Sequence, residues 1–113
     1  MRGAVGDDCD GQRLCQGLES VGVDVSGVDK VPDMETGMAY IQVNAAGDPK
    51  IANMSQANGT VTRERLPKVS HPKPDLLLVQ LEIPRDTVEY LIRCAHKEGV
   101  PTILNAAPPL PKE

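Results

Sequence analysis

The sequence lacks most of the features that would mark a membrane span, a nucleic-acid surface or an aromatic core. Its 113 residues include no Phe, no Trp and only two Tyr, so aliphatic side chains and Met must fill the core. No unbroken apolar run exceeds four residues, which excludes a transmembrane helix, and the first residues do not resemble a signal peptide. Twelve basic and sixteen acidic residues give a net charge of −4 without a basic block, which argues against nucleic acid and membranes as partners.

Cysteine and histidine are also sparse. Cys9, Cys15 and Cys94 are odd in number and form no CxxC pair, a pattern typical of reduced thiols. Neither His71 nor His96 has neighbours in sequence that suggest a metal site or a catalytic triad, so both are expected at the surface. No glycine-rich phosphate loop is present. These absences predict a small acidic protein in the cytoplasm, with the nucleus as the other open compartment.

The N-terminal residues predict the end of a strand followed by a helix. Gly3 to Val5 is short and apolar, and the Gly-Asp-Asp after it is typical of a turn rather than of a metal or phosphate site. Residues 11–21 place Leu14, Leu18 and Val21 at the spacing of one helix face. That spacing predicts that this face of the helix is buried.

Strand patterns follow over residues 23–54. The stretch before Asn44 alternates, with Ala39 and Ile41 on one face and polar or bulky residues on the other. The Asn-Ala-Ala-Gly-Asp-Pro turn that comes next predicts that the chain returns antiparallel to Met54 and forms a hairpin.

The clearest pattern, over residues 75–105, is strand, helix and strand. Leu76 to Val79 is apolar at every position, which predicts a strand buried on both faces, as in a parallel sheet. Pro84 opens a helix with one apolar face, Gly99 ends it, and a second strand runs to Leu104. The order predicts a βαβ unit with a right-handed crossover.

Two polar residues stand just past the ends of these strands. Glu82 follows the first strand and Asn105 the second, and ligands in open α/β sheets bind outside the carboxyl ends of the strands. A carboxylate at Glu82 can accept hydrogen bonds from a polyol; the alternative is a favourable charge at the helix start. Asn105 either contacts a ligand or caps the following turn.

Several short sequences occur in the order found in one enzyme family. They are Val5-Gly6-Asp7-Asp8, Gly22-Val23-Asp24-Val25-Ser26-Gly27-Val28, Thr36-Gly37-Met38-Ala39-Tyr40-Ile41-Gln42-Val43, Ala57-Asn58, Gln80-Leu81-Glu82-Ile83-Pro84, and Ile103-Leu104-Asn105 with Pro108. In this combination they resemble the ribokinases, of the PfkB-type carbohydrate kinase family, over nearly the whole chain.

The resemblance implies a partial, doubly wound (Rossmann-like) α/β core with a small β-sheet lid. Within one partial domain over residues 1–113, it assigns residues 1–22 to a core strand end and helix, 23–54 to lid strands, and 75–105 to the core βαβ unit. The implied activity is ATP-dependent phosphorylation of D-ribose to D-ribose 5-phosphate, with Mg²⁺ and a monovalent cation as further cofactors. The sugar contacts that the resemblance implies are Glu82, Ala39 and Ile41, with Asn105 as a further candidate on the substrate side.

The chain also departs from the family pattern. It lacks the sugar-binding Gly/Asn segment and the GAGD motif that supplies the base and the anion hole, so the resemblance implies a fragment without catalytic, cofactor-binding or metal-binding residues. Gln56 replaces a family glycine, and Ala106 replaces a proline. Two alternatives stay open. One is a non-catalytic interaction module, with a homodimer formed through the exposed edges of the lid strands. The other is a kinase for another sugar or nucleoside.

Overall fold

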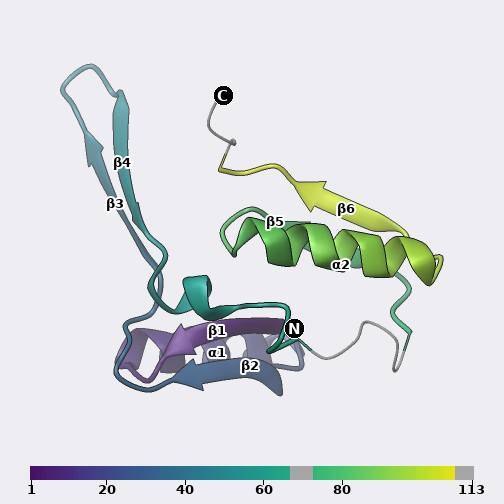
Figure 1. Cartoon of the computed structure of the whole chain (residues 1–113). Helices are drawn as coiled ribbons and strands as arrows, with labels where there is room; N and C mark the ends of the chain where they lie inside the picture. Colours follow the sequence, from purple (N-terminus) through teal and green to yellow (C-terminus); the bar gives the residue numbers. More distant parts are fainter. Residues whose placement is uncertain (67–72, 109–113) are drawn as a thin grey trace. The chain divides into compact units, whose positions relative to one another are not determined.

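A computed structural model describes residues 1–66 and 73–108 of the chain, which divides into two compact units, Met1–Asn58 and Gly59–Glu113 (Figure 1). The elements in order are β1 (Arg2–Gly6), α1 (Cys9–Ser20), β2 (Gly27–Val31), β3 (Met38–Val43), β4 (Pro49–Met54), the 3-10 helix η1 (Gln56–Thr60), β5 (Leu77–Gln80), α2 (Arg85–Lys97) and β6 (Thr102–Asn105). The expectation for His71 lies outside the described residues.

In the first unit, β1, α1 and β2 form a βαβ unit. β1 and β2 pair in parallel, with Ala4 opposite Asp29, and Val5 and Val31 are buried. Residues 27–31, which the resemblance grouped with the lid strands, thus pair with β1 and not with the hairpin. The division of the chain into core and lid otherwise remains a prediction.

The predicted buried face of α1 is exposed. The helix itself is present, and Gly22, with φ of 83°, lies just past its end in the left-handed conformation that favours glycine. However, Leu14 is 53% exposed and Val21 75% exposed. Gly11 in the first turn is the residue that α1 buries. The prediction is wrong because a periodic apolar stripe indicates which face can be buried, whereas burial also needs a partner surface.

β3 and β4 form the predicted antiparallel hairpin, with Ile41 opposite Ile51. The turn is closed by Asn44, whose side-chain oxygen accepts hydrogen bonds from the backbone N–H groups of Ala46 and Asp48, at 2.9 Å each. All six residues of each strand are exposed, so neither face of the hairpin is covered by the rest of the first unit. Ala39 and Ile41 lie on one face, as predicted, since alternate residues of a strand share a face.

The second unit contains the predicted C-terminal βαβ unit. β5 and β6 pair in parallel, and α2 contacts both strands. Val88 and Ala95 of α2 and Val79 of β5 are buried, so the helix covers the Val79 face of the sheet. The opposite face is open, because Leu78 is 69% exposed and its neighbour Ile103 52% exposed. The expectation that Leu76 to Val79 is buried on both faces is therefore wrong.

We expect these open faces to cause self-association, since contiguous exposed apolar side chains and unpaired strand edges favour contact between copies. Static light scattering of the purified chain should give a mass above that of the monomer. Ile103→Lys should lower that mass, whereas Ser20→Lys, which adds the same charge on an exposed polar site, should not. A wild-type chain that stays monomeric would contradict this expectation.

A strained backbone angle follows the hairpin. Gln56 has φ of 45°, in the left-handed region that costs a non-glycine residue about 1–2 kcal/mol. Its side chain offsets little of this, because its hydrogen bond to the carboxylate of Glu35 is long (3.3 Å) and exposed. This backbone angle also gives a physical reason for the glycine that the family carries there.

We therefore expect Gln56→Gly to stabilise the first unit. The relieved strain exceeds the extra chain entropy of glycine by about 0.5–1 kcal/mol, which corresponds to a melting temperature about 2–6 °C higher. Thermal denaturation followed by circular dichroism measures the change. Gln56→Ala is the matched control, since it removes the same side chain but keeps the strained Cβ, and it should give no gain.

Candidate functional site

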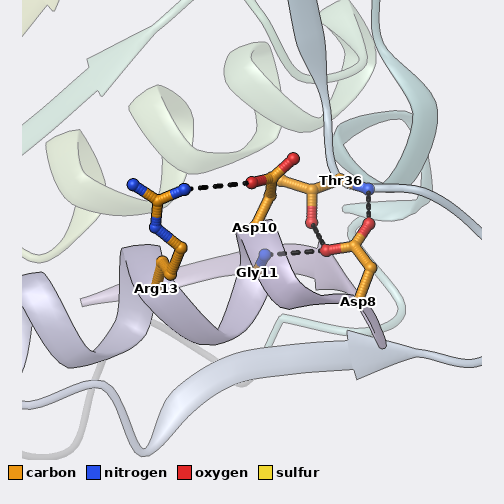
Figure 2. Close-up of polar contacts among 5 residues, drawn as sticks. All are labelled: Asp8, Asp10, Gly11, Arg13 and Thr36. Atoms are coloured by element: carbon orange, nitrogen blue, oxygen red, sulfur yellow. Dashed lines mark hydrogen bonds and ion pairs between the residues drawn. The ribbon is translucent and has the colours of Figure 1, made fainter.

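The carboxylate of Asp8 joins the start of α1 to the residue that precedes the hairpin (Figure 2). Its Oδ1 accepts hydrogen bonds from the backbone N–H of Gly11 at 2.7 Å and from the hydroxyl of Thr36 at 2.6 Å. Its Oδ2 accepts from the backbone N–H of Thr36 at 2.7 Å. The Thr36 hydroxyl accepts in turn from the backbone N–H of Gly6 at 3.0 Å. One carboxylate therefore satisfies the helix N-terminus and both polar groups of Thr36 that face it.

The backbone around this carboxylate is too close for side chains. A Cβ on Gly6 would lie 2.3 Å from the carbonyl oxygen of Met34, and a Cβ on Gly11 would lie 2.5 Å from that of Gly6. Thr36 is buried, at 6% exposure. The sequence predicts a turn at Asp7 and Asp8, but it carries no signal for the contact with Thr36, which lies 28 residues away.

A shallow groove of about 500 Å³ lies beside this junction, between α1 and the start of β3. Its lining residues are Asp10, Arg13 and Leu14 from α1 and Thr36, Gly37, Met38 and Ala39 from the hairpin side. Arg13 and Asp10 form an exposed ion pair at 3.9 Å (Figure 2). The groove contains Ala39, one of the predicted sugar contacts, while Ile41 is an exposed residue further along the same strand face. These two predicted residues thus share one apolar strand face.

Glu82 and Asn105 lie at the carboxyl edge of the β5–β6 sheet. Glu82 is two residues past β5, as predicted, and its backbone N–H donates to the side-chain oxygen of Gln80. Asn105 was predicted to lie just past the second strand. It is instead the last residue of β6 and pairs with Gln80. Both side chains are exposed and make no hydrogen bond or ion pair with the described residues. They are therefore available at one edge, in a different unit from Ala39 and Ile41.

The alternative for Asn105, a cap of the following turn, finds no hydrogen bond to support it in the described residues. The alternative for Glu82, a favourable charge at the helix start, needs no hydrogen bond and stays open. The N-cap of α2 is Pro84, and no side chain caps that helix. Asp86, in the first turn of α2, already provides a negative charge near the helix start. The role of Glu82 and Asn105 in binding is untested and remains a prediction.

The remaining reactive residues form no further site in the described part of the chain. Residues 1–66 and 73–108 bring together no group of three His, Cys, Asp or Glu side chains that could hold a metal. Cys9, Cys15 and Cys94 are free thiols, and a hydrogen bond with Cys94 raises the pKa of Tyr90. His96 is exposed, as expected. Neither of the described helices is long and apolar enough to span a bilayer.

Acid should weaken the Asp8 junction. The hydrogen bonds from Thr36 and from the backbone of Gly11 lower the pKa of Asp8 below 3.8. Its contribution to the free energy of unfolding is thus present above that value and is lost as the pH falls through the lowered pKa. Urea denaturation between pH 7 and pH 2 should show stability falling below about pH 4, with a smaller fall in Asp8→Asn. Asp7→Asn is the matched control, because the carboxylate of Asp7 makes no hydrogen bond within the described residues. It should keep the wild-type profile.

The chain is similar to known proteins over nearly its whole length. A ribokinase of Schizosaccharomyces pombe is 38% identical over 113 residues, which is 98% of this chain and 36% of that protein. The crystal structure of a ribokinase from Cryptococcus neoformans in complex with ADP is 29% identical with a TM-score of 0.81, covering 97% of this chain and 34% of that one.

The structure of a ribokinase from Arabidopsis thaliana complexed with ribose and ATP is 27% identical with a TM-score of 0.75, covering 91% of this chain and 35% of that one. The chain thus spans about a third of the length of the proteins that it matches. These likenesses confirm the expected α/β ribokinase-type fold. Residues 1–113 match the description "pfkB family carbohydrate kinase", a family of phosphotransferases. The chain belongs to the pfkB family of carbohydrate kinases.

Proposed function

We propose that this chain is part of a ribokinase, which transfers the γ-phosphoryl group of ATP to the primary hydroxyl of D-ribose. The observation that carries the proposal is the 38% identity to a ribokinase over 98% of the chain. The position of Glu82 adds support, since an exposed carboxylate at the carboxyl edge of a parallel sheet lies where ligands bind in such folds. The cytoplasm is the proposed compartment.

In this proposal the chain supplies contacts to the sugar and not the chemistry of transfer. Glu82 accepts hydrogen bonds from the sugar hydroxyls, and the face with Ala39 and Ile41 covers the sugar and excludes water. Asn105, at the same sheet edge as Glu82, is a further contact on the substrate side. A carboxylate suits this task because its two oxygens can accept from two neighbouring hydroxyls in charge-assisted hydrogen bonds.

Phosphoryl transfer needs a base for the attacking hydroxyl and a cluster of positive or dipolar groups for the phosphate charge. Within residues 1–113 no GAGD sequence or phosphate loop supplies them. Nor do the described residues form a metal-binding group, so no step is assigned here to Mg²⁺ or to a monovalent cation. ATP and these ions are proposed as ligands of the whole enzyme.

A second proposal, of a different class, is an interaction module that pairs with another copy through the hairpin. One observation favours it: β3 and β4 pair only with each other in the described sheets, which leaves both outer edges unpaired. Such edges readily accept another strand. The two proposals are compatible if the paired hairpins also cover the sugar.

A chimera tests the first proposal. The segment of the Schizosaccharomyces pombe ribokinase that matches this chain is replaced by residues 1–113. ADP release is then measured with D-ribose, deoxyribose, fructose and adenosine. We expect turnover with ribose, and none from the 113-residue chain alone. Glu82→Gln should raise the KM for ribose about tenfold or more, with the KM for ATP and the melting temperature nearly unchanged, because a charged acceptor to the sugar is lost.

Glu98→Gln is the matched control, because Glu98 is an exposed carboxylate in the same unit, at the opposite end of α2. It should leave the KM for ribose unchanged. Turnover that prefers another acceptor would move the proposal to that sugar or nucleoside. A lower melting temperature with an unchanged KM for ribose would assign Glu82 to helix stability instead.

A further inference from the structure

The β3–β4 hairpin depends on its base for its position. Every residue of its two strands is exposed, so no surface of the first unit supports either face. A two-stranded hairpin without a covered face is marginally stable in water. The contacts that fix the direction of this hairpin and keep it folded must therefore lie where its two strands join the rest of the first unit. We call residues 35–37 and 55–57 the hairpin root.

The two sides of the hairpin root are tied to each other through Glu35. Its backbone carbonyl accepts from the backbone N–H of Ala57 at 3.1 Å, and its carboxylate accepts from the side-chain amide of Gln56 at 3.3 Å. Gly37 fits closely against the other side, since a Cβ there would lie 3.1 Å from the backbone carbonyl oxygen of Ser55. The root therefore behaves as one packed piece, and a contact that holds one side holds both.

The polar contact between this root and the β1–α1 junction is made by the carboxylate of Asp8, while Ala57 on the other side of the root is fully buried. The carboxylate fixes Thr36 through two hydrogen bonds, of 2.6 and 2.7 Å, while the same oxygen that binds the Thr36 hydroxyl caps α1 (Figure 2). The hydroxyl extends the contact to β1 through the N–H of Gly6. Thr36 cannot move without losing bonds to both α1 and β1.

We propose that Asp8 is the positioning residue of the hairpin: by holding Thr36, it sets where the hairpin root attaches to the β1–α1 junction. Combined with the proposed function, on which this step rests, Asp8 thereby determines where the Ala39 and Ile41 face is presented to the sugar. Asp8 acts through Thr36 and touches no substrate. The turn-like Gly-Asp-Asp sequence thus has a role beyond the turn itself.

Hydrogen–deuterium exchange of the 113-residue chain, measured by mass spectrometry without sugar, tests this. Thr36→Val removes the hydroxyl at nearly constant volume. We expect peptides from the hairpin and its root to exchange at least about tenfold faster, because a hairpin without its anchor frays. Peptides from β2 and the second unit should keep their rates, and in β1 only the amide of Gly6, which loses its acceptor, should exchange faster. Thr36→Ser, which restores the hydroxyl, should return the hairpin to within about twofold of the wild type.

Asp8→Asn provides a second variant, since its amide keeps one acceptor oxygen for the helix cap but presents a donor to the N–H of Thr36. It should loosen the hairpin in the same local way. Three results would overturn the proposal: unchanged hairpin exchange in both variants, a hairpin already unprotected in the wild type, or exchange in β2 and at β1 residues other than Gly6 that rises together with the hairpin. The last result includes variants that fail to fold, and it would make the contact a general stabiliser of the unit.

This experiment fails separately from the test of the proposed function. A chimera without ribose turnover, together with a hairpin loosened by Thr36→Val, would reject the ribokinase proposal and keep the anchoring role. Ribose turnover together with a hairpin insensitive to both variants would keep the ribokinase proposal and reject the anchoring role.

Discussion

The hydrogen bonds around one carboxylate join the end of β1 and the start of α1 to Thr36, which lies 28 residues further along the chain. Asp8 caps α1 and binds Thr36, and Thr36 binds the last residue of β1. A negative charge is favourable there, because it lies at the positive end of the helix dipole and accepts from groups that would otherwise lack partners. Gly6 and Gly11 allow the close approach that these bonds require. The placement of the hairpin follows from this junction, since the hairpin has no covered face of its own.

The open apolar face of the β5–β6 sheet follows from the make-up of the second unit. In its described residues that unit contains one α-helix and one pair of parallel strands, and a single helix can cover only one face of a sheet. In doubly wound folds helices cover both faces, which is why a strand such as Leu76 to Val79 is apolar at every position. The exposure of Leu78 and Ile103 therefore marks the face on which such a fold places its second layer.

Local patterns in the sequence predicted the elements well, and distant contacts poorly. The hairpin was predictable because alternation and turn chemistry lie within one short stretch, and α2 because its apolar face repeats every turn. The pairing of β2 with β1 could not be predicted, because the sequence of Gly27–Val31 is that of an ordinary short strand and only the fold decides which strand it pairs with. The Asp8–Thr36 contact could not be predicted either, because it joins two residues 28 positions apart that follow no periodic pattern. The position of Glu82 just after β5 was predictable because the end of an apolar strand is visible in the sequence.

The candidate sugar site combines two kinds of chemistry that the chain keeps on different elements. Glu82 offers charge and hydrogen-bond acceptors from a rigid sheet edge, whereas Ala39 and Ile41 offer an apolar face on a hairpin anchored only at its root. The two sets of residues belong to different units, so in the proposed function each contributes to sugar binding by itself. The contribution of the Ala39 and Ile41 face depends on where the hairpin is held within the first unit. That dependence makes a contact as small as Asp8 to Thr36 relevant to substrate affinity, although neither residue needs to touch the sugar.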